Sequence, residues 1–197
     1  MNERIDSLLE KIKTLQAGLH IEFEEELKKA QKKLNYSFQK NKIIWEKKAL
    51  QAQKEFKENL YKFFRNSNIL FMITSPIIYS LIIPLVFLDL FISVYQALCF
   101  PLYGITKVKR SDYLIIDRHH LAYLNIIEKL NCIYCGYGNG LLSYGMEIAS
   151  RTEEFWCPIK HARKVKDVPP RYHHYANFGD AEKYRQKIQQ MRERKSL

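Results

Sequence analysis

Apolar residues recur at steps of mostly three and four over the first third of the chain. They are Ile5, Leu8, Ile12, Leu15, Leu19, Phe23, Leu27, Ala30, Leu34, Phe38, Trp45, Ala49, Ala52, Phe56, Leu60 and Phe63. This spacing places them on one face of an α-helix, and charged residues of both signs fill the other faces. The pattern predicts a long amphipathic helix within residues 1–67.

A single helix of this length cannot bury its own apolar stripe. Three arrangements would cover it: a coiled coil with another copy, a helical hairpin, or a position on a bilayer surface. Glu24 and Glu25 each lie four residues before a lysine, which favours a helix exposed to water. We expect an oligomerising coiled-coil helix that binds itself or a protein partner, with a lipid-binding helix as the alternative.

A second apolar segment occupies residues 68–105, and it exceeds the roughly 20 residues that cross a bilayer. Pro84 divides it, so a kinked, tilted span and a re-entrant hairpin are both open. Basic residues flank both ends, namely Lys54, Lys57, Lys62 and Arg65 before it and Lys107, Lys109 and Arg110 after it. Because cytoplasmic flanks are enriched in Lys and Arg, both ends are expected in the cytosol.

Asp89 interrupts the apolar segment. A carboxylate in hydrocarbon costs on the order of several kcal/mol unless it faces protein, water or headgroups. Asp89 is therefore expected either to form a proton or cation site, or to lie at a helix break or pair with a basic residue of a neighbouring chain.

The remaining sequence predicts helices joined by loops, which makes the predicted fold mainly α. Residues 106–178 are expected to hold an extended entry, a helix ending near Leu130, a loop at Gly136–Gly140 and a helix over 141–152. Residues 179–197 form a basic C-terminal helix, with Asp180 as its N-cap.

Four residues in this region have the spacing of metal ligands. Cys132 and Cys135 form a C-x2-C pair, and Cys157 and His161 form a C-x3-H pair. Two ligands from each of two short segments suit a tetrahedral ion, and Gly136 resembles the small residue of a rubredoxin or zinc-ribbon knuckle. The pattern predicts a structural zinc site of composition Cys3His, with iron as the alternative metal.

Other chemistry remains open at the same residues. The cysteine pair Cys132 and Cys135 has the spacing of a redox dithiol, and all of the cysteines could instead pack as small apolar side chains. Two histidine pairs, His119–His120 and His173–His174, suggest a second metal site, but no Glu-x-x-His motif supports it.

The net charge of +11 favours anionic partners. Because the basic residues lie on both flanks of the apolar segment, they suit a lipid surface better than a nucleic-acid groove. A nucleic-acid adaptor using the basic tail around Arg185, Lys187, Arg192, Arg194 and Lys195 is the weaker alternative. The charged first residues predict no signal peptide and hence a cytosolic N-terminus with reduced thiols or metal thiolates.

Three strings between about Pro76 and Ala162 carry a family resemblance. They are Asp117-Arg-His-His-Leu-Ala-Tyr-Leu-Asn125, Cys132-Ile-Tyr-Cys-Gly-Tyr-Gly-Asn-Gly140 and Thr152-Glu-Glu-Phe-Trp-Cys-Pro-Ile-Lys-His-Ala162. On these motifs the chain resembles a family of small uncharacterised bacterial membrane proteins. The resemblance implies a bacterial origin and a membrane location, and it brings no activity, cofactor or catalytic residue.

These patterns together predict a bacterial inner-membrane protein with cytosolic soluble parts, acting as a metal-stabilised scaffold or interaction module. The main rival is a membrane redox protein with iron or a dithiol at the same cysteines. No reaction is assigned, and whether the protein is an enzyme stays open.

Overall fold

The computed structural model describes residues 2–34, 36–39, 42–166, 168–169 and 171–193. The described chain is mainly helical, as the sequence predicts, with one two-stranded hairpin. It forms two compact units: residues 1–60 with 120–125, and residues 61–119 with 126–197. The second unit joins the apolar segment to the cysteine-containing region, so the predicted boundary at residue 105 lies inside one packed body.

The N-terminal unit contains α1 (Asn2–Leu34), β1 (Tyr36–Gln39), β2 (Lys42–Trp45) and α2 (Lys47–Glu55). The two strands pair antiparallel, and the rings of Tyr36 and Trp45 lie 5.0 Å apart across them. The prediction of one unbroken helix within residues 1–67 is therefore wrong: residues 36–39 and 42–45 are strands, and residues 57–59 after α2 are not helical. Aromatic and β-branched residues dominate residues 36–45 and favour a pleated strand, and the apolar stripe has a gap between Phe38 and Trp45.

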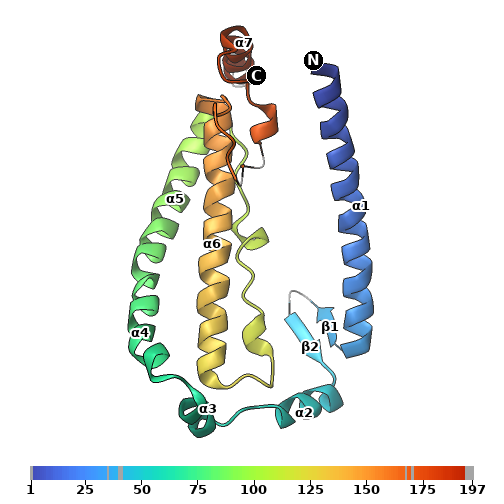
Figure 1. Ribbon diagram of the computed structural model, residues 1–197, viewed down its shortest axis with the longest axis vertical. Coiled ribbons are helices and arrows are strands. Elements are labelled where there is room, and N and C mark those ends of the chain that lie inside the picture. Colours follow the sequence, from blue (N-terminus) through green and yellow to red (C-terminus); the bar gives the residue numbers. More distant parts are fainter. Residues whose placement is uncertain (1, 35, 40–41, 167, 170, 194–197) are drawn as a thin grey trace. The chain divides into compact units, whose positions relative to one another are not determined.

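The second unit begins with α3 (Leu60–Asn66), α4 (Ile69–Ser80) and α5 (Ile82–Tyr103). α4 and α5 follow one another as a single bent rod of 35 residues, Ile69–Tyr103, which is long and apolar enough to cross a membrane (Figure 1). Leu81 forms the junction, and Pro84 lies in the first turn of α5, where a missing N–H does no harm. The kinked rod is thus the observed form, and the hairpin alternative is wrong.

α5 is followed by the capping residue Gly104, which adopts a left-handed conformation with φ of 66°. The Ile105 N–H donates to the Phe100 carbonyl at 2.9 Å, a closure typical of a glycine-terminated helix. The chain then turns back along α5 as an extended crossover, residues 104–119, which contains the short 3-10 helix η1 (Arg110–Asp112) and leads into η2 (Arg118–His120). The reversal brings the crossover alongside the helix that it has just left.

α6 (Ile126–Trp156) is one continuous helix of 31 residues. It runs parallel to the α4–α5 rod (Figure 1). Asn131 is hydrogen-bonded to Tyr79 and Thr152 to Tyr95, and between them Gly138 lies next to the Leu85 side chain. The predicted loop at Gly136–Gly140 is therefore wrong, because these glycines are places of close approach within a helix. A Cβ on Gly136 or Gly140 would lie 3.4 or 2.6 Å from a carbonyl oxygen of the crossover.

The core of this unit lies between α5, the crossover and α6. Phe100, Val108, Leu141, Tyr144 and Ile148 are its buried apolar residues. After α6 the chain passes through η3 (Tyr172–His174) to α7 (Ala181–Glu193). The predicted N-cap of that last helix is confirmed, since the Asp180 carboxylate accepts from the Lys183 N–H at 3.0 Å.

Candidate functional site

The structure does not bring the four predicted metal ligands together. Cys132 and Cys135 lie near the start of α6, whereas Cys157 directly follows its last residue. At a helical rise of about 1.5 Å per residue, the chain from Cys135 to Cys157 spans roughly 33 Å. Zinc ligand atoms lie about 2.0–2.3 Å from the ion, so the four residues as placed do not share one tetrahedral site.

His161 has other neighbours in this fold. Its ring stacks on Tyr172 with the centroids 6.1 Å apart, and its backbone N–H donates to the Tyr172 hydroxyl at 2.6 Å. His174, from the second histidine pair, contacts the Glu154 carboxylate at 3.5 Å. Within the described residues, no group of three or more His, Cys, Asp or Glu side chains is arranged to hold a metal ion.

Asp89 is instead the centre of a polar cluster that joins three elements. Arg110 of the crossover donates to it from Nη2 at 2.7 Å and from Nε at 3.3 Å. Tyr137 of α6 donates its hydroxyl at 3.0 Å, and Ser93 of α5 does so at 3.3 Å. The basic partner of Asp89 therefore belongs to its own chain, and the expected pairing with a neighbouring chain is not needed.

Gln96 makes a second polar attachment about two helical turns farther along α5 than Asp89. Its side-chain amide accepts from the Val108 N–H at 2.5 Å and donates to the Val108 carbonyl at 3.3 Å. It also donates to the Tyr144 hydroxyl at 2.7 Å. A buried amide that satisfies both backbone groups of one residue fixes the register of the crossover against α5.

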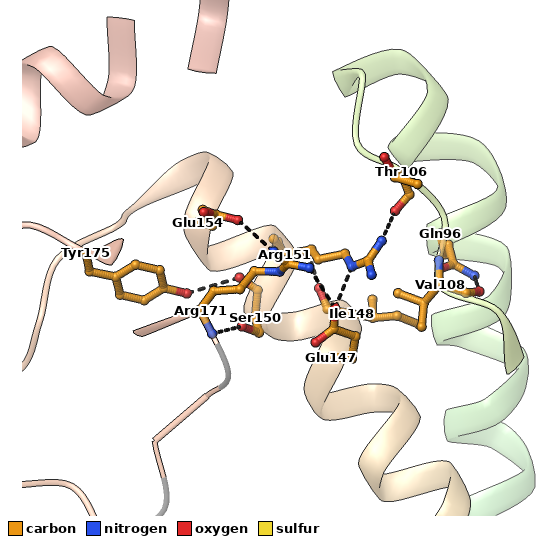
Figure 2. Close-up of polar contacts among 11 residues, drawn as sticks. Gln96, Thr106, Val108, Glu147, Ile148, Ser150, Arg151, Glu154, Arg171 and Tyr175 are labelled. Atoms are coloured by element: carbon orange, nitrogen blue, oxygen red, sulfur yellow. Dashed lines mark hydrogen bonds and ion pairs between the residues drawn. The ribbon is translucent and has the colours of Figure 1, made fainter. Parts of the chain in front are cut away.

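Glu147 organises a third cluster, near the end of α6 (Figure 2). Arg151 donates to it from Nε at 2.7 Å and Arg171 from Nη2 at 2.9 Å, while Arg151 also donates to the Thr106 carbonyl at 2.5 Å. Glu147 is only 7% exposed. Burial raises the pKa of Glu147, but the hydrogen bonds from Arg151 and Arg171 outweigh it and leave the pKa below the ordinary value.

The same cluster secures the segment that follows α6. Arg171 reaches Glu154 at 3.5 Å, and its backbone N–H donates to the Ser150 hydroxyl at 3.4 Å. Tyr175, which is 1% exposed, donates to the Ser150 carbonyl at 3.0 Å (Figure 2). Burial raises the pKa of the Tyr175 hydroxyl well above its usual range, so the hydroxyl is a permanent donor.

A small cavity of about 180 Å³ lies beside these residues. Its walls are Tyr103, Gly104, Ile105, Thr106, Arg151, Glu154, Phe155, Arg171 and Met191. Each of its charged residues is already in an ion pair. Ligand pockets commonly measure about 300–1,000 Å³, so the size and charge balance of this cavity suit packing better than substrate binding.

The three clusters have the same physical effect. Each ties the crossover or the C-terminal segment to a helix by hydrogen bonds, and two of the clusters are charge-assisted. Sequence reasoning missed them. One signal was available for the third, because Glu147 and Arg151 have the i, i+4 spacing of a helical ion pair. A separate signal was available for the close approach of the crossover to α6: Gly136 and Gly140 have an i, i+4 spacing, which is typical of close helix contacts.

The chain matches no protein-family model, no curated protein and no solved structure.

Proposed function

We propose that the protein is a membrane-anchored scaffold, held in a bilayer by the α4–α5 rod. The observation that carries this proposal is the apolar surface of the rod. Its 18-residue window of highest hydropathy has none of its residues buried within the protein. Phe71, Phe87 and Phe91 are 71%, 57% and 68% exposed. Soluble monomers rarely expose a continuous apolar patch larger than a few hundred square ångströms, so this surface requires an apolar solvent.

The hydrogen bonds of α4 support a lipid environment. Pro76 lacks the N–H that would bond the Met72 carbonyl, and the Ser75 hydroxyl donates to that carbonyl at 2.9 Å instead. The hydroxyls of Thr74 and Ser80 likewise donate to carbonyls of their own helix, at 2.9 and 2.7 Å. Internally bonded hydroxyls are what a helix needs where no water is available.

The charges at its ends orient the anchor. Basic residues precede α4 and follow α5, and Lys and Arg are enriched on the cytoplasmic side of membranes. We therefore place the protein at the bacterial inner membrane with its soluble parts in the cytosol.

Acidic substitutions in the α4–α5 rod test whether the rod holds the protein in the membrane. Wild-type protein is expected to stay in the membrane fraction after alkaline carbonate treatment, whereas the double variant Phe87→Asp/Phe91→Asp is expected to be released. Each charge placed in hydrocarbon costs on the order of several kcal/mol, so two such charges oppose stable binding of the rod to the bilayer. Thr106→Asp/Ser111→Asp adds the same charge to the exposed crossover and should remain bound. Release of the wild type by carbonate would contradict the anchor.

The N-terminal helix α1 supplies the scaffold's contact surface, which we assign to a second copy of the chain. Leu15, Leu19 and Phe23 are 73%, 68% and 60% exposed along one stripe. Acidic and basic residues flank the stripe, as in the ion pair of Lys29 with Glu26 at 2.7 Å. A second copy presents complementary charges to these flanks, and a parallel or antiparallel coiled coil would bury the stripe.

Leu19→Asp is expected to convert the oligomer to monomer, because it buries a charge in the helix seam. Ala17→Asp is the matched control: it adds the same charge to the same helix on the opposite face and should leave the oligomer intact. Light scattering of detergent-solubilised protein measures the mass. An oligomer that survives Leu19→Asp, or a monomeric wild type, would contradict self-association through α1.

A further inference from the structure

The crossover places charged side chains along α5, the longer part of the apolar rod. Val108 bonds Gln96, and Arg110 bonds Asp89. Farther back, the Arg118 guanidinium lies 3.6 Å from the Cβ position of Gly136. Two residues beyond, a Cβ on Gly138 would lie 3.5 Å from the end of the Leu85 side chain. The crossover thus accompanies α5 from its end to near its beginning.

Most charged residues of this crossover are exposed. They are Lys107, Lys109, Arg110, Asp112 and Arg118. The outward face of α5 is apolar at the same levels, with Phe87, Phe91 and Leu98 all more than half exposed. The unit is therefore amphipathic from side to side: the crossover forms its charged edge and the outward face of α5 forms its apolar edge. A protein built to cross a bilayer instead changes from apolar to polar along its axis.

A perpendicular crossing conflicts with these charges. At a helical rise of about 1.5 Å per residue the rod is about 52 Å long, whereas the hydrocarbon core of a bilayer is about 30 Å thick. If α5 crossed that core, much of the crossover would lie at the same depth in the membrane. If α4 crossed it, Glu128 and Lys129 at the start of α6 would lie there instead. Each charge in hydrocarbon costs on the order of several kcal/mol.

We infer that the rod lies in the plane of the membrane, embedded in one leaflet, with the crossover facing the headgroups. The apolar edge then rests in acyl chains over its whole length, and the charged edge stays in water. Lys107 and Lys109, which are both exposed, face the surface, so the leaflet recognised is an anionic one. This inference rests on the proposed anchor and specifies its geometry.

Depth measurements test this geometry. In a variant with all four cysteines replaced by serine, single cysteines introduced at Ile73, Phe87 or Leu98 carry a spin label, and the protein is bound to phosphatidylglycerol-containing vesicles. The collision rates with oxygen and with a water-soluble nickel complex are expected to report one common depth. A label at Lys109 should collide with the nickel complex more than ten times as often as the labels at the three rod positions. A depth that rises and falls from Ile73 to Leu98 would overturn the inference.

Sidedness gives an independent result. With single cysteines at Arg65 or Thr106, an impermeant maleimide should label both positions in inside-out vesicles and neither in spheroplasts. Labelling of one position in each preparation would show a crossing and overturn the inference. Protein that fails to float with vesicles at all would instead contradict the anchor itself, so the two failures are distinguishable. Wild-type flotation and the fold of each variant, measured by circular dichroism, are the controls.

Discussion

Glu147→Gln is expected to lower the free energy of unfolding by about 3 kcal/mol, which corresponds to roughly 6–12 °C in Tm for a unit of this size. The substitution keeps the shape of the side chain and removes its charge, so Arg151 and Arg171 lose their common carboxylate at a site that is 7% exposed. Both guanidiniums are partly exposed, which keeps the loss at the lower end of the range for buried ion pairs. Thermal unfolding in detergent measures the change.

The pH dependence of stability provides a second readout for Glu147. Its pKa is below the ordinary value of 4.5, so its contribution is fully present above that pH and is lost as the pH falls through the lower folded value. Wild-type Tm should therefore drop below about pH 4.5 more steeply than that of Glu147→Gln. Glu26→Gln removes an exposed partner of Lys29 and should change neither Tm nor its pH profile. Equal profiles for wild type and Glu147→Gln would contradict the assignment.

Gly140→Ala is expected to destabilise the second unit by about 2 kcal/mol, because it overpacks a closely filled contact. A Cβ at this position would lie 2.6 Å from the Tyr113 carbonyl oxygen and 3.0 Å from the Leu114 Cα, so the crossover backbone must move. Overpacking of this kind costs about 1–3 kcal/mol, and the cost is high where backbone rather than a side-chain end must shift. The higher helix propensity of alanine, worth about 1 kcal/mol, offsets only part of it. Chemical or thermal unfolding measures the difference.

Gly138→Ala is the matched control on the same helix. Its Cβ would meet only the end of the Leu85 side chain, at 3.5 Å, which is ordinary contact. The variant should be neutral or up to about 1 kcal/mol more stable, since alanine favours the helix. If both alanine variants were stabilised alike, the close approach of the crossover to Gly140 would be wrong.

The elements with strong periodicity could be predicted from the sequence. The apolar rod, the amphipathic α1 and the C-terminal helix with its Asp180 cap all depend on local pattern. The strands at residues 36–39 and 42–45 were missed because the apolar stripe continues across them at Phe38 and Trp45. The glycines of α6 were misread since the sequence shows their conformational freedom but does not show the backbone that packs against them.

The four predicted metal ligands do not converge for a related reason. C-x2-C spacing implies a knuckle only where the chain turns, and Cys132 and Cys135 lie within a continuous helix. The clusters around Asp89 and Glu147 depend on contacts across the fold, such as Asp89 with Arg110, that no local spacing reveals. Only the Glu147 and Arg151 pair is visible as a helical i, i+4 spacing.

The parallel arrangement of the α4–α5 rod and α6 sets the order in which the contacts between them can form. Their partners lie far apart in the chain: Tyr79 and Asn131 are 52 residues apart, and Tyr95 and Thr152 are 57. Synthesis therefore delivers the hydrophobic rod well before the helix that covers its polar side. Until α6 leaves the ribosome, Asp89 and Gln96 lack their partners Tyr137 and Tyr144, so the polar contacts of α5 are completed only after the C-terminal half has been made.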